Sequence, residues 1–260
     1  MAFFSGSIFS HTLRMYTGLC AIVPNDMAKR PDQGFQTVYL LHGMSGNSTC
    51  WTRFTSIERY ADDRGLAVIM PEVQRSFYTD MHMGLRYFTY IADELPELSR
   101  DIFGLSRVRE DNFVAGLSMG GYGALKCLFS RPETFCAGAS LSGAVDMKAV
   151  LEGDPPDGGM LTEAPAIFGD PPRLNADEDL FVLADKAAKL PLELRPRVMT
   201  CCGTDDVLTY DMNRRFREYM ERTGLEYRYG EGPGVHDWKF WDEWIVKALD
   251  FFLEKNSPEK

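Results

Sequence analysis

A serine and the glycines around it, in the run Gly116-Leu117-Ser118-Met119-Gly120-Gly121, are the residues of this chain most suited to chemistry. The run follows the pattern G-x-S-x-G. A β-prone segment, 112–115, precedes it, and a helix-like segment, 122–130, follows it. A strand, a tight turn and a helix in this order present a serine hydroxyl above a sheet edge, because glycines let the strand and the helix approach closely. Ser118 is therefore the predicted nucleophile for attack on a carbonyl carbon.

A serine is a weak nucleophile at neutral pH and needs an adjacent general base, usually a histidine that a carboxylate orients. In folds built on this turn, the acid and then the histidine follow the serine along the chain. The chain has four histidines: His11, His42, His82 and His236. Only His236 follows Ser118, and its glycine-rich loop, 232–238, can present the ring without burying it. His236 is therefore the predicted base.

The acid should lie between Ser118 and His236, at the end of a strand. The predicted strand 197–202 leads into Gly203-Thr204-Asp205-Asp206-Val207-Leu208, which offers two adjacent carboxylates. Two adjacent aspartates cannot both point at one histidine, so one of them should be solvated or cap the next helix. The residues alone leave Asp205 and Asp206 near parity.

Attack on a carbonyl creates a negatively charged oxygen that needs preorganised N–H donors. One predicted donor is the N–H of Met119, directly after the nucleophile. The second donor usually comes from the loop after an earlier strand. That loop is Leu41-His42-Gly43-Met44-Ser45-Gly46-Asn47, and the N–H of Met44 is its candidate. His42 is expected to shape the loop by hydrogen bonding, without transferring a proton.

The elements that position these residues follow from the hydrophobic pattern. Two N-terminal strands, 3–9 and 15–23, should be antiparallel, because their connection is too short for a crossover helix. Strands and helices then alternate, which predicts an α/β fold with a mostly parallel central sheet and helices on both faces. Sites in such sheets lie at the carboxyl ends of strands, where the three catalytic candidates fall. Further strands are predicted at 35–41, 66–70, 112–115, 136–141, 197–202 and around Tyr227 and Tyr229, and helices at 55–64, 85–98, 122–130, 211–222 and 242–253.

Residues 146–190 interrupt this alternation. The stretch 152–172 is too rich in proline and glycine pairs for a long helix or a central strand. A new helix is expected to start at Asn175, with acidic residues 177–179 in its first turn. We interpret 146–190 as a cap over the site of a single domain that spans 1–260. The alternative is that 146–190 is a long surface segment without a functional role.

Composition and charge narrow the classes of partner. The 260 residues carry a net charge of −10 and no compact run of Lys and Arg, which disfavours nucleic acids and anionic membranes. No stretch reaches the roughly 20 apolar residues of a membrane-spanning helix, and residues 1–10 lack the marks of a signal peptide. The six cysteines fit neither a zinc site nor a redox pair, so a reduced, cytoplasmic protein is expected.

Four segments carry a resemblance to known proteins: 40–47, 78–80, 115–123 and 235–238. Together they resemble the esterase D family of α/β-hydrolases, and most closely its bacterial tributyrin esterases. The resemblance implies hydrolysis of short-chain acyl esters through an acyl-enzyme, without a metal or cofactor. It also implies oxyanion donors at Met44 and Met119, and it favours Asp206 over Asp205 as the acid. The family includes homo-oligomers, although no interface can be read from the sequence.

Alternatives to this interpretation remain. S-formylglutathione hydrolases of the same superfamily typically have the sequence Gly-His-Ser-Met-Gly-Gly-His at the nucleophile. This chain has Leu117 and Tyr122 in place of the two histidines. The difference weakens the interpretation of the protein as a thioester hydrolase. A non-catalytic binding module on the same scaffold is disfavoured, because a serine, an acid and a histidine are all present. Trp51, Tyr78 and Trp238 are candidates for lining the substrate site, with core packing as the competing interpretation.

Overall fold

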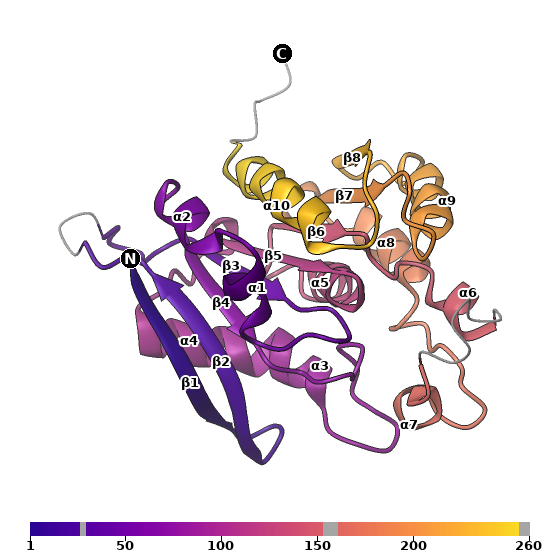
Figure 1. The fold of residues 1–260 in the computed structure, drawn as a ribbon, viewed down its shortest axis with the longest axis horizontal. Helices are drawn as coiled ribbons and strands as arrows, with labels where there is room; N and C mark the ends of the chain where they lie inside the picture. The colour runs from indigo at the N-terminus through magenta and orange to yellow at the C-terminus, as the bar shows by residue number, and fades with distance from the viewer. Residues whose placement is uncertain (27–29, 153–160, 255–260) are drawn as a thin grey trace.

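The computed structural model describes residues 1–26, 30–152 and 161–254, and its centre is an eight-stranded sheet (Figure 1). The strand order is β1-β2-β4-β3-β5-β6-β7-β8. β1 and β2 form an antiparallel hairpin, β2 is antiparallel to β4, and the remaining pairs are parallel. The predicted mostly parallel α/β sheet is therefore confirmed. The strands are β1 Ala2–Ser10, β2 Met15–Val23, β3 Thr37–Leu41, β4 Ala67–Pro71, β5 Asn112–Leu117, β6 Ala137–Leu141, β7 Arg197–Gly203 and β8 Tyr227–Gly232.

Helices cover both faces of the sheet, and each face has its own hydrophobic core. Neighbouring residues of a strand point to opposite faces, so Val38 and Leu40 of β3 belong to the core that includes residues of α1, α2 and α10, whereas Tyr39 and Leu41 belong to the core that includes residues of α4, α5, α8 and α9. The helices are α1 Cys50–Phe54, α2 Ile57–Asp62, α3 Tyr87–Thr89, α4 Leu95–Phe103, α5 Met119–Ser130, α6 Met147–Glu152, α7 Ala164–Phe168, α8 Leu180–Ala188, α9 Tyr210–Met220 and α10 Trp238–Leu253, with a π-helical turn at Tyr90–Glu94.

Several predicted helices differ in their bounds from the observed ones: for example, the helix predicted at 242–253 begins at Trp238, and the helix predicted at 122–130 begins at Met119. The helix predicted at 55–64 is split, because Thr55 is extended (φ −136°, ψ 171°) between α1 and α2. The Thr55 hydroxyl donates to the carbonyl of Trp51 and accepts the N–H of Ile57, which stabilises the break. The helix predicted at 85–98 runs from Tyr87 to Phe103 through the π-helical turn. Local side-chain hydrogen bonds, which hydrophobic spacing does not report, decide such boundaries.

The start predicted at Asn175 for the helix after the proline-rich stretch is wrong. That helix, α8, begins at Leu180, and the carboxylate of Asp179 caps it by accepting the N–H of Phe181 at 2.9 Å. Asn175 instead begins a turn in which its N–H donates to the carboxylate of Glu178. The acidic residues therefore form a turn and a cap ahead of the helix, where they compete for backbone N–H groups. The proline and glycine pairs at 155–156 and 158–159 lie outside the described residues.

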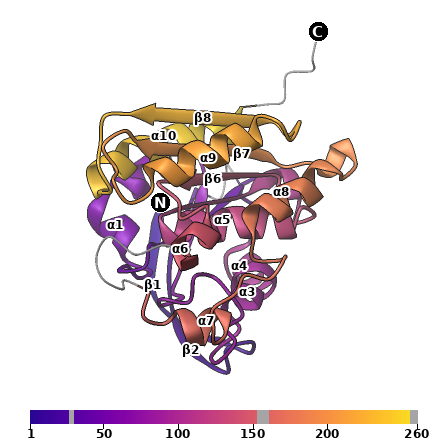
Figure 2. The same cartoon turned by 90° about the vertical axis from the view of Figure 1, so that its right-hand side faces the viewer.

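The segment 146–190 is attached to the rest of the molecule through its described parts. Figure 2 looks on to the side that carries α6, α7 and α8. The N–H groups of His82 and Met83 donate to carbonyls of α7, at 3.1 and 2.8 Å. Arg75 and Glu163 form a two-pronged ion pair at 2.6 and 3.0 Å. These contacts join α7 to the loop that follows β4.

The cysteines have the surroundings of packed thiols. All six are free, and five of them are buried. Burial raises the pKa of Cys127 to about 12, so its thiol stays protonated. Among the described residues, no helix is both long and apolar enough to cross a membrane.

Candidate active site

Ser118 occupies a sharp turn between β5 and α5. Its backbone has φ 54° and ψ −120°, a region that residues with side chains rarely adopt. Hydrogen bonds hold the turn: the Ser118 N–H donates to the carbonyl of Leu141 at 2.9 Å, and the Ser118 carbonyl accepts from Gly121 and Tyr122 at 2.9 and 3.2 Å. The backbone therefore fixes where the hydroxyl projects.

The glycines of the G-x-S-x-G run are required by close backbone contacts. A Cβ on Gly116 would overlap the carbonyl oxygen of Gly120. A Cβ on Gly120 would lie 2.5 Å from the carbonyl oxygen of Leu41. A side chain at either position would push apart the strand, the helix and the loop after β3. The mechanical reason expected for these glycines is thus observed.

Ser118, His236 and Asp206 form one hydrogen-bonded chain, although they come from three separate loops. His236 Nε2 lies 3.0 Å from Ser118 Oγ, and His236 Nδ1 lies 2.8 Å from Asp206 Oδ2. Asp206 is only 1% exposed, and it also accepts the hydroxyl of Thr209 at 2.6 Å and its N–H at 3.0 Å. With a proton on Nδ1, the ring donates to Asp206 and accepts from the serine hydroxyl.

Asp205, the competing acid, points elsewhere. It is exposed, and its carboxylate accepts the N–H of Gly234 at 3.4 Å. Burial acts to raise the pKa of Asp206, but the hydrogen bond and charge of His236 and the bonds from Thr209 outweigh it and lower that pKa to about 2. The geometry therefore pairs His236 with Asp206, as the family resemblance implied.

The two predicted oxyanion donors flank the nucleophile. Met119 is the first residue of α5, so its N–H has no acceptor within the helix. The N–H of Met44 has no acceptor among the residues that the structure describes. The loop that carries Met44 runs beside the nucleophile, since a Cβ on Gly43 would lie 3.5 Å from the Cβ of Ser118. Both amides are thus free to bind a ligand oxygen.

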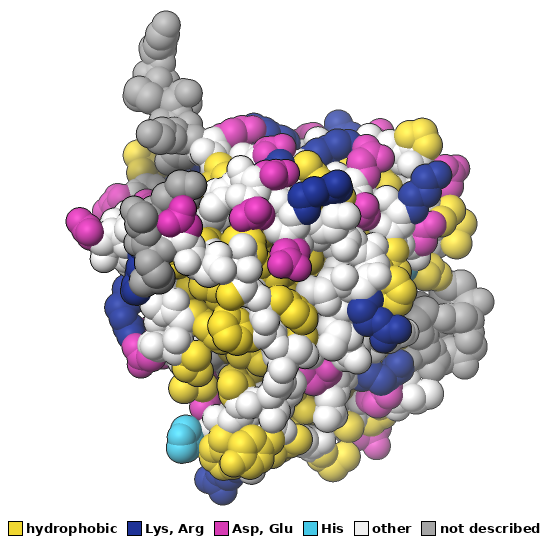
Figure 3. Space-filling model, turned by 60° about the vertical axis from the view of Figure 1, so that its left-hand side comes forward, with side chains coloured by type: hydrophobic (Ala, Val, Ile, Leu, Met, Phe, Trp, Pro, Cys, Tyr) yellow, Lys and Arg dark blue, Asp and Glu magenta, His cyan; other side chains and the backbone are white. Residues whose placement is uncertain are grey.

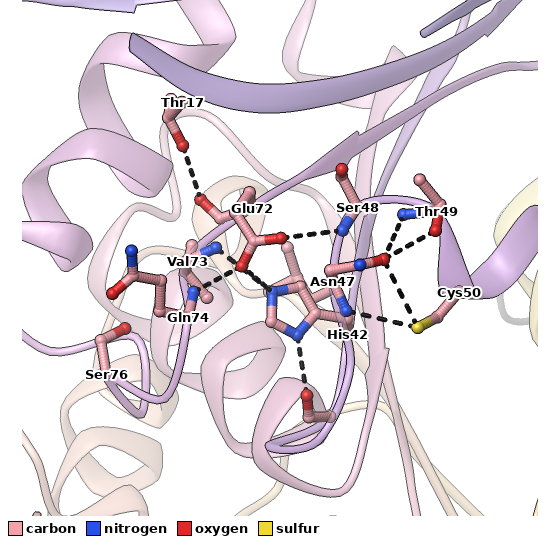
Figure 4. Close-up of polar contacts among 12 residues, drawn as sticks. Thr17, His42, Asn47, Ser48, Thr49, Cys50, Glu72, Val73, Gln74 and Ser76 are labelled. Atoms are coloured by element: carbon pink, nitrogen blue, oxygen red, sulfur yellow. Dashed lines mark hydrogen bonds and ion pairs between the residues drawn. The ribbon is translucent and has the colours of Figure 1, made fainter. Parts of the chain in front are cut away.

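The buried ring of His42 holds this loop (Figure 4). His42 Nδ1 lies 2.7 Å from the carbonyl oxygen of Gly43, and His42 Nε2 lies 3.2 Å from the N–H of Val73. A neutral ring with its proton on Nδ1 satisfies both contacts, by donating to Gly43 and accepting from Val73. The C=O and N–H of a trans peptide point in opposite directions, so fixing the Gly43 carbonyl also fixes the direction of the Met44 N–H.

Glu72 supports the same loop from the end of β4. Its carboxylate accepts the N–H groups of Gln74 and Ser48, at 2.7 and 3.2 Å (Figure 4). Its partial burial acts to raise its pKa, but contacts with His42 and with these two N–H groups lower the pKa overall. Glu72 Oε1 lies 3.5 Å from His42 Nε2, beyond a good hydrogen bond. The carboxylate therefore ties the loop to β4 mainly through backbone N–H groups.

The three candidate lining aromatics have different surroundings. Trp51 is 1% exposed, and its indole donates to the carbonyl of Leu41 at 3.1 Å. Tyr78 is fully buried, and its hydroxyl donates to the carbonyl of His42 at 2.9 Å. Both brace the loop after β3 and leave no surface for a ligand, which agrees with the core-packing interpretation. Trp238 is half-buried and stacks on the ring of Phe54.

Two supporting residues were not predicted from the sequence. Thr209 follows Asp206 by three residues, just before α9, and that spacing could have indicated a side chain that anchors the acid. Glu72 is 30 residues from His42 in the chain, and no local pattern connects them. Only the parallel pairing of β3 with β4 brings the loops after these two strands together.

Known proteins resemble this chain over nearly its whole length. The family model described as Putative esterase matches residues 10–252. An acetyl esterase of Caldicellulosiruptor saccharolyticus is 32% identical, over 96% of this chain and 98% of that protein. Substrate-bound FphF, a fluorophosphonate-binding serine hydrolase of Staphylococcus aureus, is 34% identical with a TM-score of 0.86, over 98% of this chain and 99% of that one.

A second solved structure is similar to the same extent. The S-formylglutathione hydrolase FrmB of Staphylococcus aureus, solved as the apoenzyme, is 34% identical with a TM-score of 0.84, over 97% of this chain and 99% of that one. These similarities cover the sheet, the helices and all the loops of the candidate site. They agree with the esterase D resemblance of the sequence. The chain belongs to the family described as Putative esterase, and it is a carboxylic ester hydrolase with an α/β-hydrolase fold.

Proposed function

We propose that this protein is a serine carboxylesterase that hydrolyses short-chain acyl esters, from acetyl to butyryl, through a covalent acyl-enzyme. The observation that carries the proposal is the hydrogen-bonded chain from Asp206 through His236 to Ser118. It places a general base beside a serine hydroxyl and a buried carboxylate behind that base. This is the arrangement that activates a serine for acyl transfer.

The first step acylates Ser118. His236 Nε2 takes the hydroxyl proton while Ser118 Oγ bonds to the carbonyl carbon of the ester. The resulting imidazolium is stabilised by the ionised carboxylate of Asp206. The N–H groups of Met44 and Met119 donate to the oxygen that becomes negatively charged. When this intermediate collapses, the bond to the alcohol oxygen breaks, and His236 gives its proton to the leaving alcohol.

The second step releases the acid. A water molecule gives a proton to His236 Nε2 and attacks the acyl carbon. The same two N–H groups stabilise the second intermediate. Its collapse breaks the bond to Ser118 Oγ, which takes the proton back from His236. The products are one carboxylic acid and one alcohol, and the enzyme returns to its starting state.

The proposed preference for short acyl groups draws on two kinds of support. One is the resemblance to short-chain esterases, including the acetyl esterase at 32% identity. The other is the segment 146–190, which we propose as a cap that limits acyl length. Just before that segment, the N–H of Ala144 donates to the carbonyl of Ser118 at 3.2 Å, so the segment leaves the sheet beside the nucleophile.

Thioester hydrolysis is the second candidate, favoured by the 34% identity with the S-formylglutathione hydrolase FrmB. The residues that depart from the usual pattern of such enzymes are buried: Leu117 is 3% exposed and Tyr122 is 0% exposed. The hydroxyl of Tyr122 donates to the carbonyl of Glu178 at 2.7 Å. A substrate would contact neither side chain. The departure from the usual pattern is therefore weaker evidence against thioester hydrolysis than the sequence alone suggested.

Rates on a matched substrate panel test the proposal. The panel is p-nitrophenyl acetate, butyrate and octanoate, an acetylated sugar, a feruloyl ester and S-formylglutathione, with the Ser118→Ala variant as the control. We expect fast turnover of the acetyl and butyryl oxygen esters, slow turnover of octanoate, and weak turnover of the thioester. Dominant S-formylglutathione hydrolysis would select the second candidate. Turnover that survives in Ser118→Ala would exclude both mechanisms.

A further inference from the structure

His236 lies at one end of a chain of aromatic rings that meet at right angles. The ring of Trp241 is 5.0 Å from the ring of His236, centroid to centroid, at an interplanar angle of 90°. Trp238 meets Trp241 at 5.3 Å and 87°, and Trp51 meets Trp238 at 5.2 Å and 89°. Perpendicular rings at such separations attract each other through their quadrupoles. The proposed general base is therefore packed against an indole as well as hydrogen-bonded to Asp206 and Ser118.

The contact between His236 and Trp241 is set by the way α10 begins. Asp237 caps this helix, because its carboxylate accepts the N–H of Phe240 at 3.1 Å. His236 is the residue before the cap, and Trp241 is the fourth residue of the helix. Side chains at these two positions often pack together and fix the angle at which the chain enters a helix. The pair usually consists of two hydrophobic residues, whereas here one member is the proposed base.

The hydrogen bonds of His236 do not by themselves fix the tilt of its ring. They hold the two nitrogen atoms, and the ring can still tilt about the line that joins these atoms. The loop that carries His236 contains Gly232 and Gly234, which give its backbone unusual freedom. A bulky ring packed at a right angle against the imidazole opposes this tilt. Trp241 can do so because it is itself only 6% exposed and is enclosed by its neighbours.

We infer that Trp241 is a positioning residue for the general base, which it holds upright between Asp206 and Ser118. The inference rests on the proposed function, since it gives a role to the neighbour of the proposed base. Among the described residues, the indole N–H of Trp241 has no hydrogen-bond partner, so its ring contacts hold it in place. The ring rather than the N–H is therefore the part of Trp241 that acts on His236.

The aromatic chain also links the base to the predicted oxyanion loop. The indole of Trp51, at the far end of the chain, donates to the carbonyl of Leu41 at 3.1 Å. Leu41 ends β3 and comes directly before the loop that carries Met44. One set of packed rings thus contacts both the loop that carries the base and the strand end from which the oxyanion loop starts.

Trp244 offers a matched control on the same helix. It is 8% exposed, close to the value for Trp241. Its ring stacks on Phe240 at 5.4 Å and 29°, and it covers Gly230 of β8, where a Cβ would overlap it. No ring contact joins Trp244 to His236 in the part of the chain that the structure describes. A substitution of Trp244 therefore disturbs the core without touching the proposed base.

Kinetics of paired variants test the role of Trp241. Trp241→Leu should lower kcat on p-nitrophenyl acetate by about 10², the loss typical of a misplaced reacting group, with a smaller change in KM. Trp241→Phe keeps an aromatic ring beside His236 and should recover much of the rate. Trp244→Leu should lower the melting temperature to a similar extent but keep the wild-type kcat. Equal losses of kcat in Trp241→Leu and Trp244→Leu would overturn the inference.

Indole fluorescence tests the contact without turnover. A protonated imidazole quenches the emission of an indole that it touches, so the emission of the wild type should fall as the pH is lowered through the range in which histidines titrate. His236→Asn and Trp241→Phe should each remove this change, whereas Trp244→Phe should retain it. A change that persists in His236→Asn or in Trp241→Phe would show that the two rings are not in contact.

The emission comes from this cluster because all four tryptophans of the chain lie in α1 and α10. Figure 3 shows hydrophobic side chains at the surface on the side of the β1–β2 hairpin, and no tryptophan lies in that hairpin. The exposed aromatic residues of the hairpin are Phe3, Phe4, Phe9 and Tyr16. Turnover that survives in Ser118→Ala would reject the proposed function but leave the fluorescence result unchanged, so the two failures are distinguishable.

Discussion

Among the described residues, two histidine rings lie near carboxylates, and only one of these pairs has the geometry for proton transfer. His236 Nδ1 is 2.8 Å from Asp206, its Nε2 faces a serine hydroxyl, and its side chain is 18% exposed. His42 Nε2 is 3.5 Å from Glu72, faces a backbone N–H, and belongs to a side chain only 1% exposed. An accessible ring whose Nε2 faces a serine hydroxyl fits the proposed general base. A buried ring whose Nε2 faces a backbone N–H fits a structural role.

The two pairs act on different atoms in the proposed reaction. His236 and Asp206 move the proton of Ser118. His42 contacts the carbonyl of Gly43, which fixes the direction of the Met44 N–H, the proposed oxyanion donor. Loss of the first pair should therefore remove the chemistry, whereas loss of the second should weaken only the stabilisation of the oxyanion. The following predictions separate these roles, from the largest expected effect to the smallest.

Removal of the nucleophile or the base should have the largest effect. Ser118→Ala and His236→Ala should each lower kcat by about 10⁶, because either change stops activation of the hydroxyl. The double variant should be no worse than either single one, since the two residues act as a unit. Steady-state rates with p-nitrophenyl acetate measure this, and circular dichroism should show an unchanged fold. Additive losses would mean that the two side chains act separately.

Neutralising the acid should have the next largest effect. Asp206→Asn should lower kcat by about 10⁴, because the amide cannot stabilise the imidazolium and favours the wrong tautomer of His236. Asp205→Asn is the matched control, and it should change kcat by less than about tenfold, since the exposed carboxylate of Asp205 accepts from the Gly234 N–H and the Thr204 hydroxyl and not from His236. The opposite ranking would show that Asp205 is the acid.

Removal of the structural histidine should have an intermediate effect. His42→Ala should lower kcat by about 10²–10³, the loss typical of one oxyanion donor, with a smaller change in KM. His42→Asn can place an amide N–H near the position of Nδ1 and should recover part of the rate. The pH dependence of kcat should keep the wild-type shape in both variants. A changed profile would give His42 a role in proton transfer.

The lowered pKa of Asp206 predicts a pH-dependent share of stability. Its pKa falls from 3.8 to about 2 on folding, so the group stabilises the fold above pH 4 and loses that contribution as the pH falls to 2. The shift corresponds to about 2 kcal/mol. Urea unfolding of the wild type and Asp206→Asn should therefore show a difference in free energy that shrinks by about this amount between pH 6 and pH 2. A difference that is constant with pH would contradict the prediction.

The carboxylate behind the structural histidine should matter least. Glu72→Gln keeps one carbonyl oxygen for the N–H groups of Gln74 and Ser48, so it should cost about 1 kcal/mol in stability and lower kcat by less than about tenfold. The contrast with Asp206→Asn tests whether the two carboxylates differ as the two histidines do. Thermal unfolding and kcat with p-nitrophenyl butyrate measure both quantities. A loss of kcat as large as that of Asp206→Asn would contradict the different roles proposed for the two carboxylates.

Much of the candidate site could be predicted from residue types and their order. Ser118 follows from the glycines around it, whose absence of Cβ atoms the turn requires, and His236 is the only histidine after it. The parallel sheet follows from alternating hydrophobic periods. The start of α8 was misplaced because acidic side chains can bind backbone N–H groups in a turn as well as in a helix cap.

The sequence by itself determined which groups could react and in which order they occur along the chain. The tertiary structure decided which of two adjacent aspartates meets His236, because side-chain direction depends on the turn after β7. It also decided that Tyr78 and Trp51 hold the loop after β3, and that Glu72 reaches the same loop. These contacts join segments far apart in the chain, and only the pairing of β strands sets the distances between them.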